Sequence, residues 1–495
     1  MNFLDQEIEL TPAHSSRKWS LQQESIFDAV RAQSQAILVQ AVAGSGKTTT
    51  IVEAMQYGGS RPVFLAFNKS IQTELASRIT LGEAKTLNAL GFAAVRRHIP
   101  AATLDIKKNS IHLQKAWTEI GLNSDQMRQH GFSAGRLMGV AKNMAIGCPN
   151  QPASSVEVFA DLAETYWFTF PEDIKDAILL ATVTAFDRAA GDQNLIDFDD
   201  QLYYPVRYEW DLPSFSDAFV DECQDLSPIQ HLLLEKLGIK GTRIVAVGDR
   251  FQAIYGFRGA AANSMDDLKG MFGMIELPLS TTYRCPQSVV LEAQNYCPDI
   301  QARDGAPFGD VIRVHKDPNL WSDGSMILCR NNAPLFRAIL RHVRAKEPCR
   351  VLSNFLEALQ SFIRSFKCSS TGQLRNRLNS WYEKERKKAE EDEAWGKLAG
   401  LEDRYETLCV LAAEFKTVDD LLACLKTLST SARGPIFSTI HKAKGLEAHH
   451  TYLLRPDLLP SRFAFGEAAQ KQEDNLSYVA ITRAQETFTY GAMKE

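Results

Sequence analysis

The chain has 495 residues, of which 45% are hydrophobic and 23% charged, the composition of an ordinary globular protein. It is too long for a single hydrophobic core, so we expect several structural units. The formal net charge of −5 gives no overall signal for nucleic acid or for a membrane surface. A nucleic-acid binder of this charge would need locally basic grooves on an otherwise acidic body.

The N-terminal sequence MNFLDQEIEL is acidic and has no long apolar run, so we do not expect a secretory signal. No stretch approaches the roughly 20 apolar residues of a membrane span. The nine cysteines are scattered, and no two have the two-residue spacing of a zinc ribbon or a redox pair. These features predict a cytoplasmic protein in a reducing compartment, without contact to a membrane.

Short apolar runs alternate with helical patterns along the chain. A buried strand is predicted at 36–42, before a glycine-rich loop and a helix, and a second at 62–67, before the helical spacing of Ile71, Leu75 and Ile79. Helix-rich sequence fills residues 89–190 and about 346–429. The further predicted strands are 217–222, 243–249, 326–330 and 448–454. Strands that alternate with helices indicate an α/β fold with parallel sheets.

The simplest organisation is two α/β cores, each interrupted by a helical insertion. The first core comprises residues 1–88 and 191–277, around the insertion 89–190. The second comprises residues 278–345 and 430–495, around the shorter insertion 346–429. The charged run at 381–398 is predicted to be a solvated helix face, stabilised by pairs such as Glu383 and Lys387, rather than a binding tail.

The sequence AVAGSGKTTT at residues 41–50 is typical of a phosphate-binding loop, although Ala41 stands where the first glycine is usual. The loop follows a predicted strand and opens a predicted helix, so its backbone N–H groups would converge on phosphates at the positive end of that helix. Lys47 would neutralise the terminal phosphates and Thr48 would bind magnesium. The alternative interpretation is a glycine turn with an exposed lysine.

Two adjacent acids, Asp221 and Glu222, end the apolar run DAFVDE. Adjacent carboxylates repel each other unless a cation neutralises them. Asp221 would hold magnesium, directly or through water, and Glu222 would polarise the attacking water, as phosphoryl transfer requires. The alternative is a helix N-terminus, which favours acids. In combination with the loop at 41–48, the pair indicates a nucleotide-hydrolysing site.

The sequence DECQD at 221–225 resembles motif II of the superfamily 1 helicases, and the chain is similar to their UvrD/Rep branch, the superfamily 1A DNA helicases, over nearly its whole length. AVAGSGKT is this family's own form of the loop, which begins with alanine. The other matching motifs are SLQQESIF, LAFNKSIQTEL, TLNALG, AVGDRFQAIYGFRGA, TTYRCP, STIHKAKGLEAHH and LSYVAITRAQE. The resemblance implies two RecA-like P-loop domains with parallel sheets, named 1A and 2A, and helical insertions named 1B and 2B.

The resemblance implies that ATP and Mg²⁺ bind between the two cores. Gln23 would read the adenine edge, Tyr283 would stack on the adenine, and Glu447 would lie near the ribose. The residues that would surround the phosphates are Ala43, Gly44, Ser45, Gly46, Lys47, Thr48 and Thr49, with Thr48 and Asp221 also holding the metal.

Three further residues would act on the phosphates by the same resemblance. Gln252 would sense the γ-phosphate, Arg284 would reach it, and Arg483 would be an arginine finger. Hydrolysis spreads negative charge over the transferred group, and catalysis is mostly positioning and charge stabilisation. Because these arginines belong to the second core, hydrolysis would depend on closure of the cleft between the cores.

The resemblance also implies single-stranded DNA contacts from both cores. Phe67 stands one residue after the family's usual aromatic position, Asn88 stands where histidine is usual, and Phe257 stands where tryptophan is frequent. Rings such as Tyr255 would offer stacking faces, and lysines that include Lys444 could line a basic track. The residues implied to bind DNA are Asn68, Lys69, Thr86, Tyr255, Phe257, Arg258, Thr439, His441 and Lys442.

Two other groups of residues carry weaker signals. Basic pairs at 96–97 and 107–108 in the first insertion either contact phosphates or form solvated surface, and the sequence leaves both open. His441, His449 and His450 are not expected to form a metal site, because no cysteine or acid stands at ligand spacing.

The leading interpretation is an ATP-dependent DNA helicase or translocase that acts at single-strand to double-strand junctions, with 3′-to-5′ movement implied by KGLE at 444–447. A second is a translocase that strips proteins from DNA and unwinds poorly, which the short second insertion favours. A third is a non-motor DNA-binding or scaffold protein, against which the intact catalytic set counts. We expect a monomer; the motifs do not predict protein partners or a pathway such as repair or replication.

Overall fold

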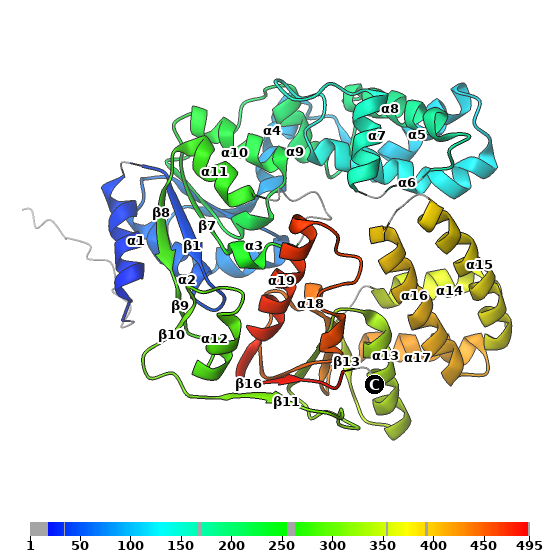
Figure 1. Ribbon diagram of the computed structural model, residues 1–495. Helices are drawn as coiled ribbons and strands as arrows, with labels where there is room; N and C mark the ends of the chain where they lie inside the picture. The colour runs from blue at the N-terminus through cyan, green and yellow to red at the C-terminus, as the bar shows by residue number, and fades with distance from the viewer. Residues whose placement is uncertain are drawn as a thin grey trace, which may run out of the picture.

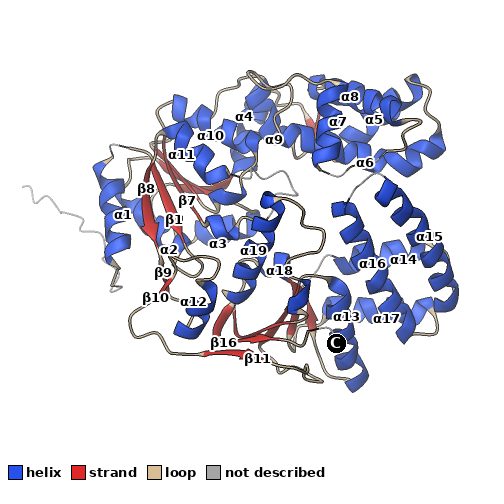
Figure 2. Cartoon of the chain, in the orientation of Figure 1, coloured by secondary structure: helices blue, strands red, loops and turns tan. Residues whose placement is uncertain are grey.

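The computed structural model describes residues 18–33, 35–166, 168, 170–254, 263–352, 355–391 and 395–493. These residues form two six-stranded sheets and two short two-stranded pairings. In Figure 1 the first sheet lies beside α1 and α2 and the second lies below α18 and α19, with the two helical units on the far side of the molecule from α1. Figure 2 separates strands from helices and shows helices beside both sheets. The predicted fold class, two parallel α/β cores with helical insertions, is confirmed.

The first sheet has the strand order β3–β2–β6–β7–β1–β8, and every neighbouring pair is parallel. Ile37 and Val39 of β1 pack with one set of helices, whereas Leu38 packs in the apolar cluster on the other face. Both faces are therefore covered, which explains why the strands are continuous apolar runs. The strands are β1 (Ile37–Ala41), β2 (Pro62–Ala66), β3 (Glu83–Thr86), β6 (Asp217–Val220), β7 (Arg243–Gly248) and β8 (Ile275–Leu279).

The strands predicted at 36–42, 62–67, 217–222 and 243–249 are present as β1, β2, β6 and β7. The prediction missed β3 and β8, which are the two edge strands of this sheet. Their sequences EAKT and IELPL contain polar residues or proline, which an edge position tolerates. The helices and turns against this sheet are α1 (Leu21–Ala32), α2 (Lys47–Ala54), η1 (Met55–Tyr57), α3 (Lys69–Ala76), η2 (Cys223–Asp225), α10 (Pro228–Ile239), η3 (Arg250–Gln252) and α11 (Ser264–Phe272).

The first helical unit shares its hydrophobic core with one face of the first sheet. A single apolar cluster runs from Leu38 and Val63 of the strands, through Leu90 and Leu202, to Trp117, which is buried among the helices. The unit is therefore packed onto the sheet rather than joined to it by a linker. Its elements are α4 (Leu87–His98), β4 (Thr103–Leu104), α5 (Lys108–Glu119), α6 (Ser124–Asn143), α7 (Val156–Thr165), α8 (Lys175–Gly191), β5 (Leu195–Ile196) and α9 (Asp200–Arg207).

A buried charge network lies inside this unit. Lys108 Nζ is 2.7 Å from Asp200 Oδ2, and Lys142 Nζ is 2.6 Å from Asp197 Oδ2 and 2.8 Å from Asp200 Oδ1. Lys108 and Lys142 are fully buried. Of the basic pair at 107–108, Lys108 is therefore neither a phosphate contact nor solvated surface. It is enclosed by opposite charges from a segment far along the chain.

The second sheet has the strand order β11–β16–β15–β12–β14–β13 and is also parallel throughout. The predicted strands 326–330 and 448–454 are β12 and β15 near its centre. The prediction missed β14, a partly buried inner strand, and also β11, β13 and β16, which are exposed, short or partly polar. The strands are β11 (Asp310–Arg313), β12 (Ser325–Cys329), β13 (Arg350–Val351), β14 (Ile436–Thr439), β15 (Ala448–Leu453) and β16 (Ala484–Tyr490).

Helices and turns around the second sheet complete this core, and a short pairing of β9 with β10 lies beside the chain that enters it. The elements are β9 (Thr281–Thr282), α12 (Gln287–Ala293), β10 (Gln301–Ala302), α13 (Asn332–Ala345), α18 (Ile440–Ala443), η5 (Pro456–Leu458) and α19 (Glu467–Ile481).

The second helical unit is likewise continuous with its sheet. One apolar cluster joins Ile327 and Phe437 of the strands to Leu378, Leu411 and Leu425 of the helices. The unit is made of α14 (Phe355–Ser365), α15 (Thr371–Glu391), α16 (Trp395–Glu414) and α17 (Val418–Thr430). Together these contacts make the second sheet and the short insertion one packed body.

Polar contacts reinforce this junction. Asp403 of α16 accepts hydrogen bonds from the backbone nitrogens of Asn332, at 2.7 Å, and Ala333, at 3.1 Å, which begin α13. In the charged run at 381–398, Glu383, Lys384, Lys387, Glu390 and Glu391 are exposed, and Arg386 pairs with Glu383 at 2.9 Å. Among the helices described here, none is long and apolar enough to cross a membrane.

We predict that Lys142→Met lowers the midpoint of thermal unfolding strongly, because it leaves Asp197 and Asp200 buried without one of their cations. Removal of one partner of a buried pair typically costs about 3–5 kcal/mol. The matched control is Lys175→Met, which removes an exposed lysine 3.2 Å from Glu172 and should cost about 0–1 kcal/mol. Circular dichroism melts of both variants test this, and equal midpoints would show that the network does not form in solution.

Candidate functional site

The loop between β1 and α2 has the backbone of a phosphate-binding turn. Gly44 and Gly46 have φ angles of 71° and 80°, a region that glycine adopts without strain. Gly46 is the N-cap of α2 and provides no side-chain cap, so the first backbone N–H groups of that helix lack a capping side chain. Such a helix start attracts anions. The hydroxyl of Ser45 instead turns inward and donates to Val42 O at 2.8 Å.

The acidic pair after β6 lies directly beside this loop. Thr48 Oγ1 donates to Asp221 Oδ2 at 2.8 Å, and Lys47 is almost completely buried. Burial and the neighbouring Glu222 raise the pKa of Asp221 to about 6. Burial also opposes ionisation of Glu222, but the positive charges of Lys47 and Lys444 outweigh it and hold that pKa at about 2. The two acids therefore differ in basicity, and Glu222 is the one kept ionised.

Thr48 and Asp221 fit a divalent cation of the magnesium type. Hydroxyl and carboxylate oxygens are the donors that Mg²⁺ prefers, and their atoms already lie 2.8 Å apart. Across the described ranges there is no group of three or more His, Cys, Asp or Glu side chains that could hold a metal. A magnesium ion here would share its coordination with phosphate oxygens and water, as Mg²⁺ usually does.

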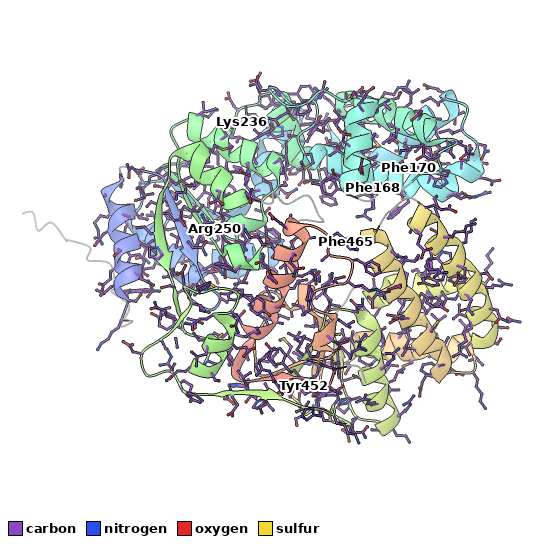
Figure 3. The ribbon with its side chains drawn as sticks, viewed as in Figure 1. Phe168, Phe170, Lys236, Arg250, Tyr452 and Phe465 are labelled. Atoms are coloured by element: carbon purple, nitrogen blue, oxygen red, sulfur yellow. The ribbon has the colours of Figure 1, made fainter. Side chains whose placement is uncertain are left out.

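A chain of hydrogen bonds links the carboxyl ends of β6 and β7. Gln224 Nε2 donates to Glu222 Oε2, and the backbone nitrogen of Asp249 donates to Gln224 Oε1 at 3.1 Å. Gln252 Nε2 donates to Asp249 Oδ2 at 2.7 Å. Arg250, labelled in Figure 3, anchors this region to β8 through Glu276 Oε1 at 2.7 Å. The predicted γ-phosphate sensor is thus connected to the acidic pair through fixed polar side chains.

Arg284 and Arg483 of the second core lie in the same region, but their side chains are hydrogen-bonded to other residues of the second core. Arg284 Nε donates to Glu447 Oε2 at 2.6 Å, and Arg284 Nη1 donates to Thr482 O at 3.2 Å. Arg483 is only 1% exposed, and its guanidinium donates to Val479 O at 2.9 Å and Leu446 O at 3.0 Å. Burial and the nearby Arg284 lower the pKa of Arg483 to about 9.

The two cores contact each other across the phosphate loop. The backbone nitrogen of Tyr283 donates to Gly44 O at 2.9 Å, and the backbone nitrogen of Ala43 donates to the Tyr478 hydroxyl at 2.9 Å. A Cβ atom on Gly44 would lie 2.5 Å from Arg284 Cβ. The loop therefore lies against the second core in a closed arrangement, with no room for a side chain at Gly44.

Of the residues expected around the base, one is buried and two are exposed. Gln23 is buried: its Oε1 accepts from Ser20 N at 3.0 Å, and its Nε2 donates to Thr50 Oγ1 at 2.9 Å, so the carboxamide braces α1 against α2. Tyr283 and Glu447 are exposed, and Glu447 is paired with Arg284. Thr49 is half-buried on the first turn of α2.

Those residues expected to contact DNA that the structure describes lie at the carboxyl ends of strands in both sheets. Asn68 Oδ1 caps α3 by accepting from Ile71 N at 2.9 Å, and Thr86 Oγ1 caps α4 by accepting from Ala89 N at 3.1 Å. Lys69 follows Asn68 and is exposed. These caps place the helix starts after β2 and β3 on one edge of the first sheet.

In the second core, Thr439 ends β14 and begins α18, which carries His441 and the exposed Lys442. Tyr255, Phe257 and Arg258 lie outside the described residues. The sequence reasoning missed Phe198, which is 56% exposed and whose backbone oxygen accepts from Asn88 Nδ2 at 3.1 Å. Its signal is a lone aromatic residue between aspartates in the sequence DFDD.

Lys444 does not face the same side as Lys442. Its side chain is almost completely buried, and Lys444 Nζ lies 2.5 Å from Asp225 Oδ2 in the first core. It therefore does not belong to a DNA-facing basic track, and that expectation is wrong for Lys444.

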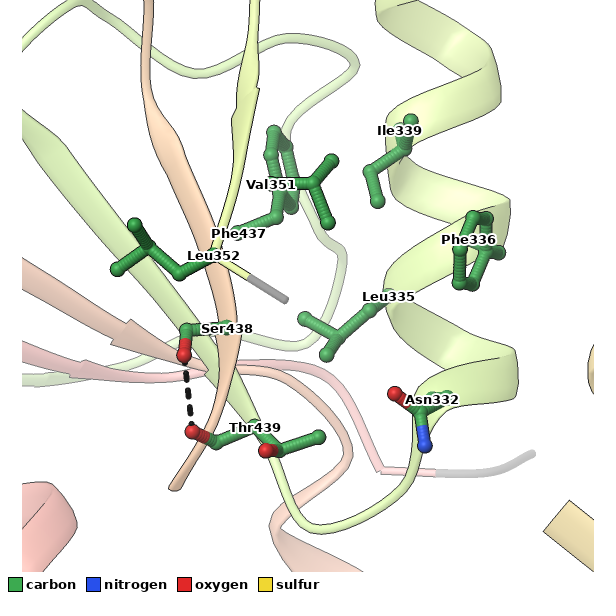
Figure 4. Close-up of a pocket in the computed structure, with 9 residues that line it drawn as sticks. All are labelled: Asn332, Leu335, Phe336, Ile339, Val351, Leu352, Phe437, Ser438 and Thr439. Atoms are coloured by element: carbon green, nitrogen blue, oxygen red, sulfur yellow. Dashed lines mark hydrogen bonds between the residues drawn. The ribbon is translucent and has the colours of Figure 1, made fainter. Parts of the chain in front are cut away.

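A small pocket lies between α13 and the β13–β14 edge, next to Thr439 (Figure 4). Its space is about that of one water molecule, so it is not a nucleotide site. The lining residues are Asn332, Leu335, Phe336, Ile339, Val351, Leu352, Phe437, Ser438 and Thr439.

Family comparisons agree with this arrangement. Residues 68–273 match the model of the UvrD/REP helicase N-terminal domain, and residues 261–494 match the model of the UvrD-like helicase C-terminal domain. The chain therefore belongs to the UvrD/Rep helicase family.

Individual relatives are distant. The chain is 24% identical to the F-box DNA helicase protein 1 of Schizosaccharomyces pombe over 94% of its own length and 56% of that protein. It is 25% identical to the ATP-dependent DNA helicase Rep of Buchnera aphidicola over 47% of its own length and 36% of that protein. It thus matches little more than half of the former and about a third of the latter. A solved helicase, Arterivirus nonstructural protein 10 with DNA, is 10% identical over 94% of this chain and 63% of that chain, at a TM-score of 0.35.

We predict that Gly44→Ala separates the two cores, because its new methyl group would collide with Arg284 and Thr282. The matched control is Gly241→Ala, since Gly241 also has a positive φ of 85° but no atom lies within 4 Å of the place its methyl group would take. Both variants carry a backbone cost of about 1–2 kcal/mol. Small-angle X-ray scattering should show a larger radius of gyration only for Gly44→Ala, and an unchanged value would contradict the closed contact.

Proposed function

We propose that the chain is an ATP-driven motor that moves along single-stranded DNA and separates duplexes, a DNA-stimulated ATPase and helicase. The observation that carries this proposal is the meeting of Lys47, Asp221 and Glu222 from one sheet with Arg284 from the other, across a contact between two parallel sheets. Family membership supports the same assignment. Division of residues into domains 1A, 1B, 2A and 2B at the boundaries expected from the sequence is part of this proposal.

In this proposal, the first core positions the phosphates and the water. The backbone N–H groups at the start of α2 and the Lys47 ammonium hold the phosphates, with Ala43, Gly44, Ser45, Gly46 and Thr49 forming the surrounding loop. Thr48 and Asp221 would hold Mg²⁺, which supplies charge neutralisation on the phosphates. Glu222 orients the attacking water and takes its proton, since nearby lysines keep it ionised. Gln252 would contact the γ-phosphate, and it is linked to Glu222 through the hydrogen bonds of Asp249 and Gln224.

The second core supplies positive charge for the transition state. Arg284 and Arg483 would stabilise the phosphoryl group, but both are hydrogen-bonded within the second core. They can reach a nucleotide only after a rearrangement of the cleft, so hydrolysis is coupled to movement of the cores. Tyr283 would stack on the adenine, Glu447 would bind the ribose, and Gln23 would border the base.

The DNA would cross the carboxyl-end edges of both sheets. Asn68, Lys69 and Thr86 from the first core and Thr439, His441 and Lys442 from the second offer polar and cationic contacts to a backbone. Single-strand binding without sequence preference also needs stacking faces. The exposed rings of Phe67 and Phe198 would provide such faces, in addition to the Tyr255 and Phe257 expected from the sequence. Movement from 3′ to 5′, action at junctions and a monomeric protein complete the proposal.

A specific observation favours a second candidate, a translocase that displaces proteins and unwinds poorly. The short second insertion shares one apolar cluster with its sheet and caps α13 through Asp403. A unit packed in this way has little freedom to move against its sheet or to reach a duplex on its own.

We predict that ATP turnover by the full chain rises strongly with single-stranded DNA and that only the 3′-tailed of two tailed duplexes is opened. Steady-state ATPase assays and fluorescence unwinding assays on the same preparation test this. Stimulation without unwinding would favour the translocase. Absence of stimulation would refute the motor.

We predict that Lys47→Ala lowers DNA-stimulated turnover by about 10³-fold or more, since an essential phosphate cation is lost, while single-strand affinity stays close to that of the wild type. Lys416→Ala, at an exposed lysine of the second helical unit, is the control for expression and folding. Fluorescence anisotropy with labelled oligo-dT measures the affinity. Joint loss of turnover and affinity would assign the loop a structural role instead.

A further inference from the structure

Lys444 crosses from the second core into the first. It follows α18 by one residue, and its Nζ donates to Asp225 Oδ2 at 2.5 Å and to Gln252 O at 2.7 Å. The same Nζ lies 3.7 Å from Glu222 Oε2. Every one of these acceptors belongs to the first sheet's polar edge. A single cation of the second core therefore lies among carbonyl and carboxylate groups of the first core, 3.7 Å from Glu222 Oε2.

The acceptors of Lys444 are not independent of one another. Asp225 ends η2, the turn that starts after Glu222, and Gln252 ends η3 after β7. Gln224 ties the two turns together, since it donates to Glu222 and accepts from the backbone of Asp249. Displacement of Lys444 would therefore act on both turns and on the carboxylate of Glu222 between them.

Asp225 depends on this contact. It is buried, and its other carboxylate oxygen, Oδ1, has no hydrogen-bond partner among the described groups. A buried carboxylate needs a cation close by, so Lys444 is strongly preferred at this position. The contact holds the chain after α18 at a fixed place against the first core.

The other end of the same short segment carries the residues proposed to face DNA. Thr439 begins α18, Lys442 is exposed on it, and Ile440 and Ala443 are buried in the apolar cluster of the second core. The buried side chains prevent the turn from deforming on its own. A shift of the DNA-facing side therefore moves Lys444 with it.

We propose that Lys444 is the positioning residue through which DNA bound at Thr439–Lys442 sets the orientation of Glu222, so that ATP turnover depends on DNA. This inference rests on the proposed function and adds to it the route of the coupling. Lys444 acts through Glu222 and Asp225 and touches neither nucleotide nor DNA. Its ammonium keeps Glu222 in place when the DNA-facing turn is engaged and releases it when that turn moves.

The test is Lys444→Met in the full chain, which keeps the length of the side chain and removes the charge. We expect the DNA-stimulated kcat to fall by about tenfold or more, as for loss of one charge contact at a reacting group. The KM for ATP and the anisotropy-measured Kd for labelled oligo-dT should each change by less than about twofold, since neither ligand loses a contact. Lys471→Met, at an exposed lysine of α19, is the matched control and should behave as the wild type.

A second variant separates positioning from simple support. Lys444→Met combined with Asp225→Asn removes the unpaired buried charge, so its midpoint of thermal unfolding should recover while its stimulation by DNA stays low. Recovery of stimulation in the double variant would overturn the inference and make Lys444 a structural partner of Asp225 only. Normal stimulation in Lys444→Met, or a weakened Kd with normal kcat at saturating DNA, would overturn it as well.

Failure of the proposed function is recognisable in the same assays. A wild-type chain without DNA-stimulated turnover refutes both the motor and the coupling route. A stimulated wild type beside an equally stimulated Lys444→Met refutes the coupling route alone.

Discussion

Two adjacent carboxylates, the buried Asp221 and the half-buried Glu222, set the main electrostatic constraint on this molecule. Carboxylates this close repel each other, and burial adds to the cost of keeping them ionised. Cations from both cores offset this cost: Lys47 at the end of the loop after β1 and Lys444 from the segment after α18. The cations around this acidic pair therefore come together only when the two cores are in contact.

Parallel topology explains why this site and the DNA-facing residues share one side of each sheet. The carboxyl ends of parallel strands lie along one edge, so the turns after β1, β2, β3, β6 and β7 open on the same side. Lys47 and Asn68 follow β1 and β2, Thr86 ends β3, and Thr439 ends β14 in the second sheet. The residues proposed to bind nucleotide and those proposed to bind DNA are therefore neighbours without any special arrangement of the loops.

The helical units are extensions of the sheets' cores. In the first, the Lys108–Asp200 and Lys142–Asp197 pairs hold the segment that carries Phe198, while apolar side chains continue from the sheet into the helices. In the second, one apolar cluster spans sheet and insertion. Each insertion therefore packs as one body with the sheet that it interrupts.

The sequence by itself determined the strands β1, β2, β6, β7, β12 and β15, the glycine loop and the acidic pair, because continuous apolar runs and short spacings encode them locally. It missed the edge strands β3 and β8, whose half-buried residues need no such run. Only the tertiary structure decided the direction of side chains that meet partners far along the chain. Lys444 and Asp225 are 219 residues apart, and Lys108 and Asp200 are 92 apart. The burial of Gln23 and Arg483 also results from packing. Gln23 bonds to Thr50 of another helix, and Arg483 bonds to Leu446 O of another segment.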